Sequence, residues 1–160
     1  DHSHIIFKID NPEELAMFDL SNQLKERKII LNPFEEGNIA EYWINEGYVW
    51  LMHARSAVPN NPKNIGGKHP DGSIGRGVQY PFTKPLKGQY HSEWDESRLN
   101  SWKEVLRKVI KFHYSYESNL ECISTEFIPN TDYGEGSTYS LYDNSLACAE
   151  WIRSEIKKVN

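Results

Sequence analysis

Three short motifs in this sequence combine residue types that bind metal ions and move protons. They are DHSH at residues 1–4, HAR at residues 53–55 and TEF at residues 125–127. Carboxylate oxygens together with an imidazole nitrogen suit Mn²⁺, Mg²⁺, Co²⁺ or Zn²⁺, and such a site needs no thiolate. The arginine of the second motif offers a fixed fork of donors for a hydroxyl pair, a carboxylate or a phosphate. The motifs therefore indicate metal-assisted chemistry on an oxygen-rich substrate.

Each motif lies at the end of a segment that has the character of a β-strand. Residues 4–9 (HIIFKI) form a short strand or a strand exit, and residues 48–56 (YVWLMHARS) form the most apolar predicted strand. Cys122, Ile123 and Thr125 fit a buried strand, and turn residues follow shortly after Glu126. The carboxyl ends of parallel strands meet at one rim of a sheet, so we expect the three motifs to converge there.

Helices are predicted between these strands. Asn11 caps a helix that runs to about Lys25, and Asn38 caps a second helix that ends at Gly47. Residues 58–88 have no helical or strand period and are predicted to be a long loop, and loops of this length are usually functional lids or disordered. The order of elements is typical of parallel βα units, which predicts an α/β fold.

The clearest helical signal is a stripe of five apolar residues at helical spacing: Trp102, Val105, Leu106, Val109 and Ile110. Ser101 and Glu104 are predicted to form a capping box at the start of this helix. A last helix is predicted over residues 145–158, with Asp143 or Asn144 as its cap.

Length and composition limit the functional classes. A chain of 160 residues has the size of a single domain. Its formal net charge is -5 with scattered basic residues, which argues against a nucleic-acid partner. No apolar stretch approaches the roughly 20 residues that span a bilayer, and no segment resembles a signal peptide. Cys122 and Cys148 are the only cysteines and are expected to be reduced, so we expect a soluble cytoplasmic protein without a membrane partner.

The set DHSH, HAR and TEF-x-P-x-x-DYG resembles the sugar isomerase and epimerase group of the xylose isomerase-like TIM barrels, and specifically the C-terminal portion of such a barrel. Residues 74–82 (IGRGVQYPF) also resemble a Gly-x-Gly segment that follows the histidine strand in some members. The resemblance implies that residues 1–160 form one unit, a partial TIM barrel made of its C-terminal βα units with parallel strands.

The resemblance also implies roles for individual residues. Asp1, His53 and Glu126 would be ligands of a divalent metal ion (Mn, Mg, Co or Zn), and His4 and Arg55 would contact the oxygens of a sugar substrate. Glu126 would also be the catalytic residue that moves a proton next to the substrate carbonyl, through an enediolate. The implied protein is an isomerase or epimerase of carbohydrate metabolism.

The chain departs from the family in three respects. A complete barrel needs about 250 residues, and the strands that would precede DHSH are absent. The first glutamate of the family's site is absent with them. The interval between the first two motifs is long for one βα unit and implies an insertion. Because a half-barrel exposes strand edges, we expect association with a second copy or with the missing N-terminal half.

Other interpretations of these residues stay open at this point. The chain could be a non-catalytic or truncated fragment that binds metal or sugar, or a structural domain. A metal-dependent phosphodiesterase would need more histidine ligands and a basic face. His53 could be a hydrogen-bonded core histidine, Glu126 could pair with a nearby base, and Arg55 could pair with an acid at the rim.

Overall fold

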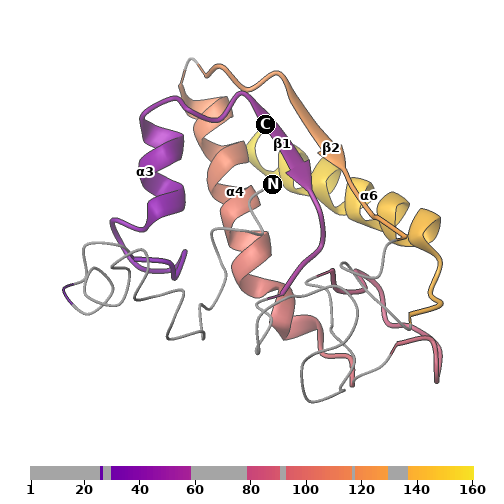
Figure 1. Cartoon of the computed structure of the whole chain (residues 1–160). Helices are drawn as coiled ribbons and strands as arrows, with labels where there is room; N and C mark the ends of the chain where they lie inside the picture. The colour runs from indigo at the N-terminus through magenta and orange to yellow at the C-terminus, as the bar shows by residue number, and fades with distance from the viewer. Residues whose placement is uncertain (1–25, 27–29, 59–78, 91–92, 117, 130–136) are drawn as a thin grey trace.

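The computed structural model (Figure 1) describes residues 26, 30–58, 79–90, 93–116, 118–129 and 137–160. The strand predicted over residues 4–9 and the helix predicted from Asn11 lie outside the described residues. So do most of the long loop, Asp1 and His4.

Two short parallel strands form the sheet of the described region. β1 (Leu51–Ala54) pairs with β2 (Cys122–Thr125), and the register places His53 beside Ser124. β1 is shorter than the predicted segment 48–56. Burial alternates along β1, because Met52 is buried on one face whereas His53 is exposed on the other. The described part is thus mixed helix and strand with a two-stranded parallel sheet, which is compatible with a partial α/β fold.

Helix α3 (Ile39–Asn45) begins where the sequence predicts it. The side chain of Asn38 caps the helix by accepting a hydrogen bond from the Glu41 N–H at 3.0 Å. The helix ends just before Gly47, whose φ of 73° lies in the left-handed region that glycine occupies without strain.

Helix α4 (Asn100–Ser115) follows directly on a 3₁₀ helix, η2 (Glu96–Leu99). The predicted capping box is wrong, because Leu99 occupies the cap position of α4 and makes no side-chain cap bond. The cap lies instead at the start of the continuous helical stretch, where Asp95 accepts from the Ser97 N–H at 2.9 Å. Because the 3₁₀ helix runs directly into α4, the position that needs a capping side chain lies upstream of Ser101.

Helix α6 (Leu141–Val159) begins earlier than predicted. Ser140 is its cap and accepts from the Asp143 N–H at 3.1 Å, so the caps predicted at Asp143 or Asn144 are wrong. Asn144 lies within the helix and is buried. Its Oδ1 accepts from the backbone N–H groups of Phe82 at 2.7 Å and Thr83 at 3.0 Å, which ties the segment 79–90 to α6.

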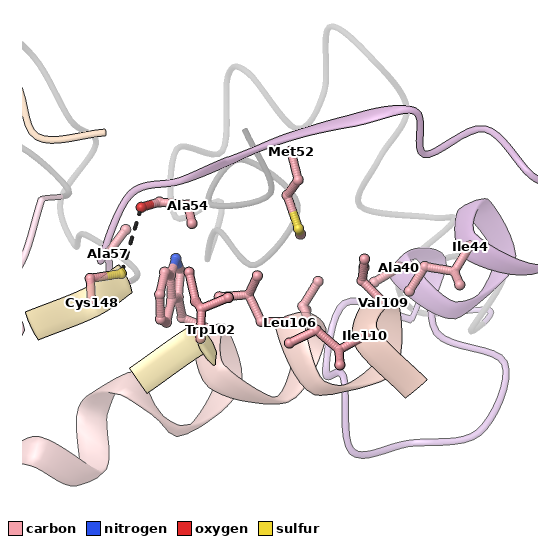
Figure 2. Close-up of a cluster of buried hydrophobic side chains, with 12 residues drawn as sticks. Ala40, Ile44, Met52, Ala54, Ala57, Trp102, Leu106, Val109, Ile110 and Cys148 are labelled. Atoms are coloured by element: carbon pink, nitrogen blue, oxygen red, sulfur yellow. Dashed lines mark hydrogen bonds between the residues drawn. The ribbon is translucent and has the colours of Figure 1, made fainter. Parts of the chain in front are cut away.

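The predicted stripe of α4 forms the centre of the core (Figure 2). Trp102 and Leu106 of α4 lie beneath Met52 and Ala54 of β1, and the cluster extends to α3 at one end and to α6 at the other. The buried cluster comprises Ala40, Ile44, Met52, Ala54, Ala57, Trp102, Val105, Leu106, Val109, Ile110, Cys148 and Ile152. Helices α4 and α6 therefore cover one face of the strand pair. None of the described helices is long and apolar enough to cross a membrane.

Both cysteines are free, but their surroundings differ. Cys122 is exposed, so its predicted burial is wrong. The alternation of β2 directs Ile123 toward the core and Thr125 toward Ser145 of α6, which leaves Cys122 on the opposite face. Cys148 is fully buried, and burial raises the pKa of its thiol to about 12, although the charge of Lys103 opposes that shift.

The core predicts a position-dependent effect of leucine truncation. Leu106→Ala should lower the free energy of unfolding by about 2–5 kcal/mol, because a cavity replaces a fully buried side chain. Leu146→Ala makes the same change at a 43% exposed position of α6 and should cost at most about 0.5 kcal/mol. Urea unfolding measures both values, and equal losses would contradict the described core.

The two thiols should react differently in the folded protein. A chromogenic disulfide reagent at pH 8 should modify Cys122 rapidly, whereas Cys148 should react only after unfolding, since it is buried and protonated.

The burial of Cys148 also makes the stability of the protein depend on pH in the alkaline range. Above the ordinary thiol pKa of 9.0 the unfolded chain loses this proton first, so stability present below pH 9 declines toward pH 12. Urea unfolding between pH 8 and pH 10 should show a smaller decline for Cys148→Ala than for wild type.

Candidate functional site

The candidate site lies where the two parallel strands end. Ala54 is beside Thr125 in the register, so the next residues, Arg55 and Glu126, are neighbours across the strand pair. The backbone N–H of Glu126 donates to the carbonyl of Ala54 at 3.3 Å and extends the pairing to this point. The local pairing thus places one basic and one acidic side chain at the same rim.

Three of the predicted site residues come together here. A terminal nitrogen of Arg55 donates to Glu126 Oε2 at 2.9 Å, and His53 Nδ1 lies 3.6 Å from the same oxygen. Both distances end on one carboxylate, which is therefore the centre of the cluster. Asp1 and His4, the other two predicted members, lie outside the described residues.

Burial differs sharply among the three side chains. The side chain of Arg55 is 4% exposed, that of Glu126 is 27% exposed and that of His53 is 46% exposed. His53 is therefore not a core histidine. The interpretation that Arg55 pairs with an acid at the rim agrees with the observed contact. Since a buried guanidinium needs a counter-ion, Glu126 also has a structural role.

The arrangement leaves part of the carboxylate for chemistry. Arg55 binds Oε2, whereas Oε1 makes no hydrogen bond to any other residue of the described ranges. The exposed imidazole of His53 stands on the same side of the strand pair as this carboxylate. A bound molecule would therefore contact an imidazole nitrogen and a carboxylate oxygen. Arg55 would hold that carboxylate in position through its hydrogen bond to the other oxygen.

The donors at the rim have the chemistry of the predicted metal site, but the described residues supply only two of its three predicted ligands. Within the described ranges no group of three or more histidine, cysteine or acidic residues could hold a metal ion. Divalent ions of this kind take four or more ligands, some of them water or substrate. The third predicted protein ligand, Asp1, lies outside the described residues.

Gln79 supports the site and could not be found from the sequence pattern. Its side chain is buried, its Oε1 accepts from the Ile128 N–H at 2.8 Å, and its Nε2 donates to the Ile128 carbonyl at 3.3 Å. Nε2 also donates to the Tyr139 hydroxyl at 3.2 Å. Burial raises the pKa of Tyr139, whereas the hydrogen bond from Gln79 opposes that shift. Gln79 thus fixes the backbone two residues beyond Glu126.

The ion pair predicts that neutralising Glu126 destabilises the protein. Glu126→Gln should lower the free energy of unfolding by about 1–3 kcal/mol, because the buried guanidinium of Arg55 loses the negative charge of this partner. Glu121→Gln is the matched control, since Glu121 is exposed at the other end of β2. Urea unfolding of the two variants at pH 7 compares them, and equal stability would exclude a structural role for the pair.

No family model matches this chain, and no curated protein or solved structure is significantly similar to it. Function is therefore inferred from the residues of this chain and from the geometry of its strand ends.

Proposed function

We propose that the chain is part of a divalent-metal-dependent isomerase or epimerase that acts on a sugar or sugar derivative by proton transfer through an enediolate. The observation that supports this proposal is the convergence of His53 and Arg55 on the Glu126 carboxylate, at 3.6 and 2.9 Å, where two parallel strands end. An imidazole and a carboxylate at such a rim, with the carboxylate held by a buried guanidinium, suit a metal ion that binds a substrate with neighbouring oxygens.

In this proposal Glu126 is the residue that moves the proton. Its carboxylate takes a proton from the carbon next to the substrate carbonyl, and the electron pair of that C–H bond moves to form the enediolate. A second acid, which the sequence does not identify, delivers a proton to the neighbouring carbon or to the opposite face. The first outcome is isomerisation and the second is epimerisation.

The other residues hold the reacting groups in place. His53 and Glu126, with Asp1, would hold the metal ion, which supplies Lewis-acid polarisation of the substrate carbonyl when bound. The side chain of Arg55 is too deeply buried for substrate binding to be its main role, which is instead to position Glu126. His4 would orient a substrate hydroxyl. The remaining strands of the proposed barrel would come from outside residues 1–160.

A second candidate is a metal- or sugar-binding protein without turnover. The salt bridge favours it, because one oxygen of the proposed base is already bound by Arg55. The two candidates share the ligand residues and differ in whether the substrate exchanges a proton. They can therefore be separated by two measurements on the same protein.

Metal binding is the first measurement. Calorimetric titration with Mn²⁺ should show one site in the wild-type chain and its loss in His53→Ala, because the imidazole would be a ligand. His113→Ala is the matched control, since this histidine lies in the last turn of α4 and outside the site. Identical Mn²⁺ binding by wild type and His53→Ala would exclude the proposed ligand set.

Proton exchange is the second measurement. In D₂O with Mn²⁺, ketoses and aldoses should incorporate deuterium next to the carbonyl with the wild-type chain and not with Glu126→Gln, at a temperature where both are folded. Nuclear magnetic resonance of the sugar measures the incorporation. Mn²⁺ binding without exchange would favour the second candidate, and undiminished exchange with Glu126→Gln would exclude Glu126 as the base.

A further inference from the structure

A groove of about 570 Å³ lies along the side of β2 and is separate from the His53–Arg55–Glu126 cluster. It is bounded by the last two turns of α4, by the C-terminal half of α6 and by residues 120–125. We call it the β2 groove. Its volume is within the range of about 300–1,000 Å³ that is typical of binding pockets.

The walls of the β2 groove are helix faces. Residues 110, 113 and 114 of α4 and residues 149, 152, 153 and 156 of α6 recur at the spacing of neighbours on one helical face. Most of the α6 positions are apolar, and Ala149 has the smallest side chain among them. Ile110 and Ile152 also belong to the core, so the groove is a continuation of the core toward solvent.

The floor of the β2 groove is the edge of a strand. Every residue of β2 lines it, together with Leu120 and Glu121. β2 pairs with β1 along one edge, and no strand of the described region pairs with its other edge. Such an edge carries backbone donors and acceptors that can pair with another extended chain. The backbone groups of the β2 edge and the apolar side chains of the helices therefore lie side by side along the groove.

The charges at the groove indicate a peptide of mixed charge. Glu121 and Arg153 both line the groove, and neither forms an ion pair with another residue of the described ranges. A bound peptide could place a basic residue near Glu121 and an acidic residue near Arg153. A small apolar molecule would fill the space but would leave the edge of β2 unpaired.

A second copy of the chain fits this surface less well. If two copies associated through this surface, each groove would face the concave groove of the other copy, and no side chain would fill either groove. Antiparallel pairing of β2 with itself about a twofold axis between Ile123 and Ser124 would set Glu121 of one copy opposite Glu126 of the other. Like charges directly opposite each other destabilise a strand pair.

We propose that the β2 groove binds an extended segment of another polypeptide, which pairs as an added strand with the edge of β2 that no strand of the described region occupies. Alternate aliphatic side chains of that segment enter the space beside Ala149, and the backbone pairing gives affinity. This interaction does not require the strand-end cluster to be catalytic.

The test uses a phage-displayed library of random twelve-residue peptides, selected on the immobilised full chain. Enriched sequences should carry aliphatic residues at every second position, and one of them, made synthetically with a fluorophore, should bind in solution by anisotropy. Ala149→Phe fills the groove and Arg153→Glu reverses its charge, so each should weaken binding at least about tenfold. Lys157→Glu, the same reversal on α6 outside the groove, should leave affinity unchanged.

Two further readouts show whether the peptide is bound as a strand. Hydrogen exchange of the β2 amides should slow when the peptide is bound, and modification of the exposed Cys122 should slow with it. The proposal is overturned if no peptide is enriched, if the affinity of the enriched peptide is the same for Arg153→Glu as for wild type, or if β2 amides gain no protection. It is also overturned if the chain self-associates through this groove. Arg153→Glu decides the result if Ala149→Phe fails to fold.

Discussion

The parallel pairing of β1 with β2 depends on the helices that cover one of its faces. Two strands of four residues each are too short to be stable by themselves, and parallel strands require a long crossover connection. The chain between them contains α4, whose apolar stripe packs against Met52 and Ala54. Burial of Trp102 and its neighbours therefore stabilises the strand pair as well as the helix. The position of every residue at the strand ends follows from this packing.

The same alternation that buries Met52 determines the chemistry on the other face. Side chains alternate along a strand, so a core position at Met52 requires that His53 faces away from the helices. The parallel register then brings Arg55 to the side of Glu126, and Gln79 fixes the backbone just beyond it. The buried guanidinium is a constraint of its own, because it holds the Glu126 carboxylate at 2.9 Å. Stability and the proposed chemistry thus share one carboxylate.

The sequence predicts the features that are repeated along the chain and the Asn38 cap, and it misses several features that depend on single contacts. The stripe from Trp102 to Ile110 has a helical period, so α4 is predictable. The TEF motif lies at the end of β2, as the sequence predicts. The caps at Asp95 and Ser140 were missed because several polar residues near each helix start are equally suitable by type. Gln79 was missed because a glutamine that bonds a backbone 49 residues away leaves no local pattern. The exposure of Cys122 depends on which face of β2 the helices cover.

The strand-end cluster and the β2 groove share one strand, and this links the two proposals. β2 ends at Thr125, directly before Glu126, and the edge of β2 with which no described strand pairs faces the groove. A strand added there in parallel orientation would end at the same rim, because parallel strands bring their carboxyl ends together. Its own acidic or histidine residues would then lie beside Glu126, where the described residues supply only two of the predicted metal donors. A strand added in antiparallel orientation would present its amino end at that rim. The direction of the bound segment therefore determines whether a partner completes the site or only covers the edge.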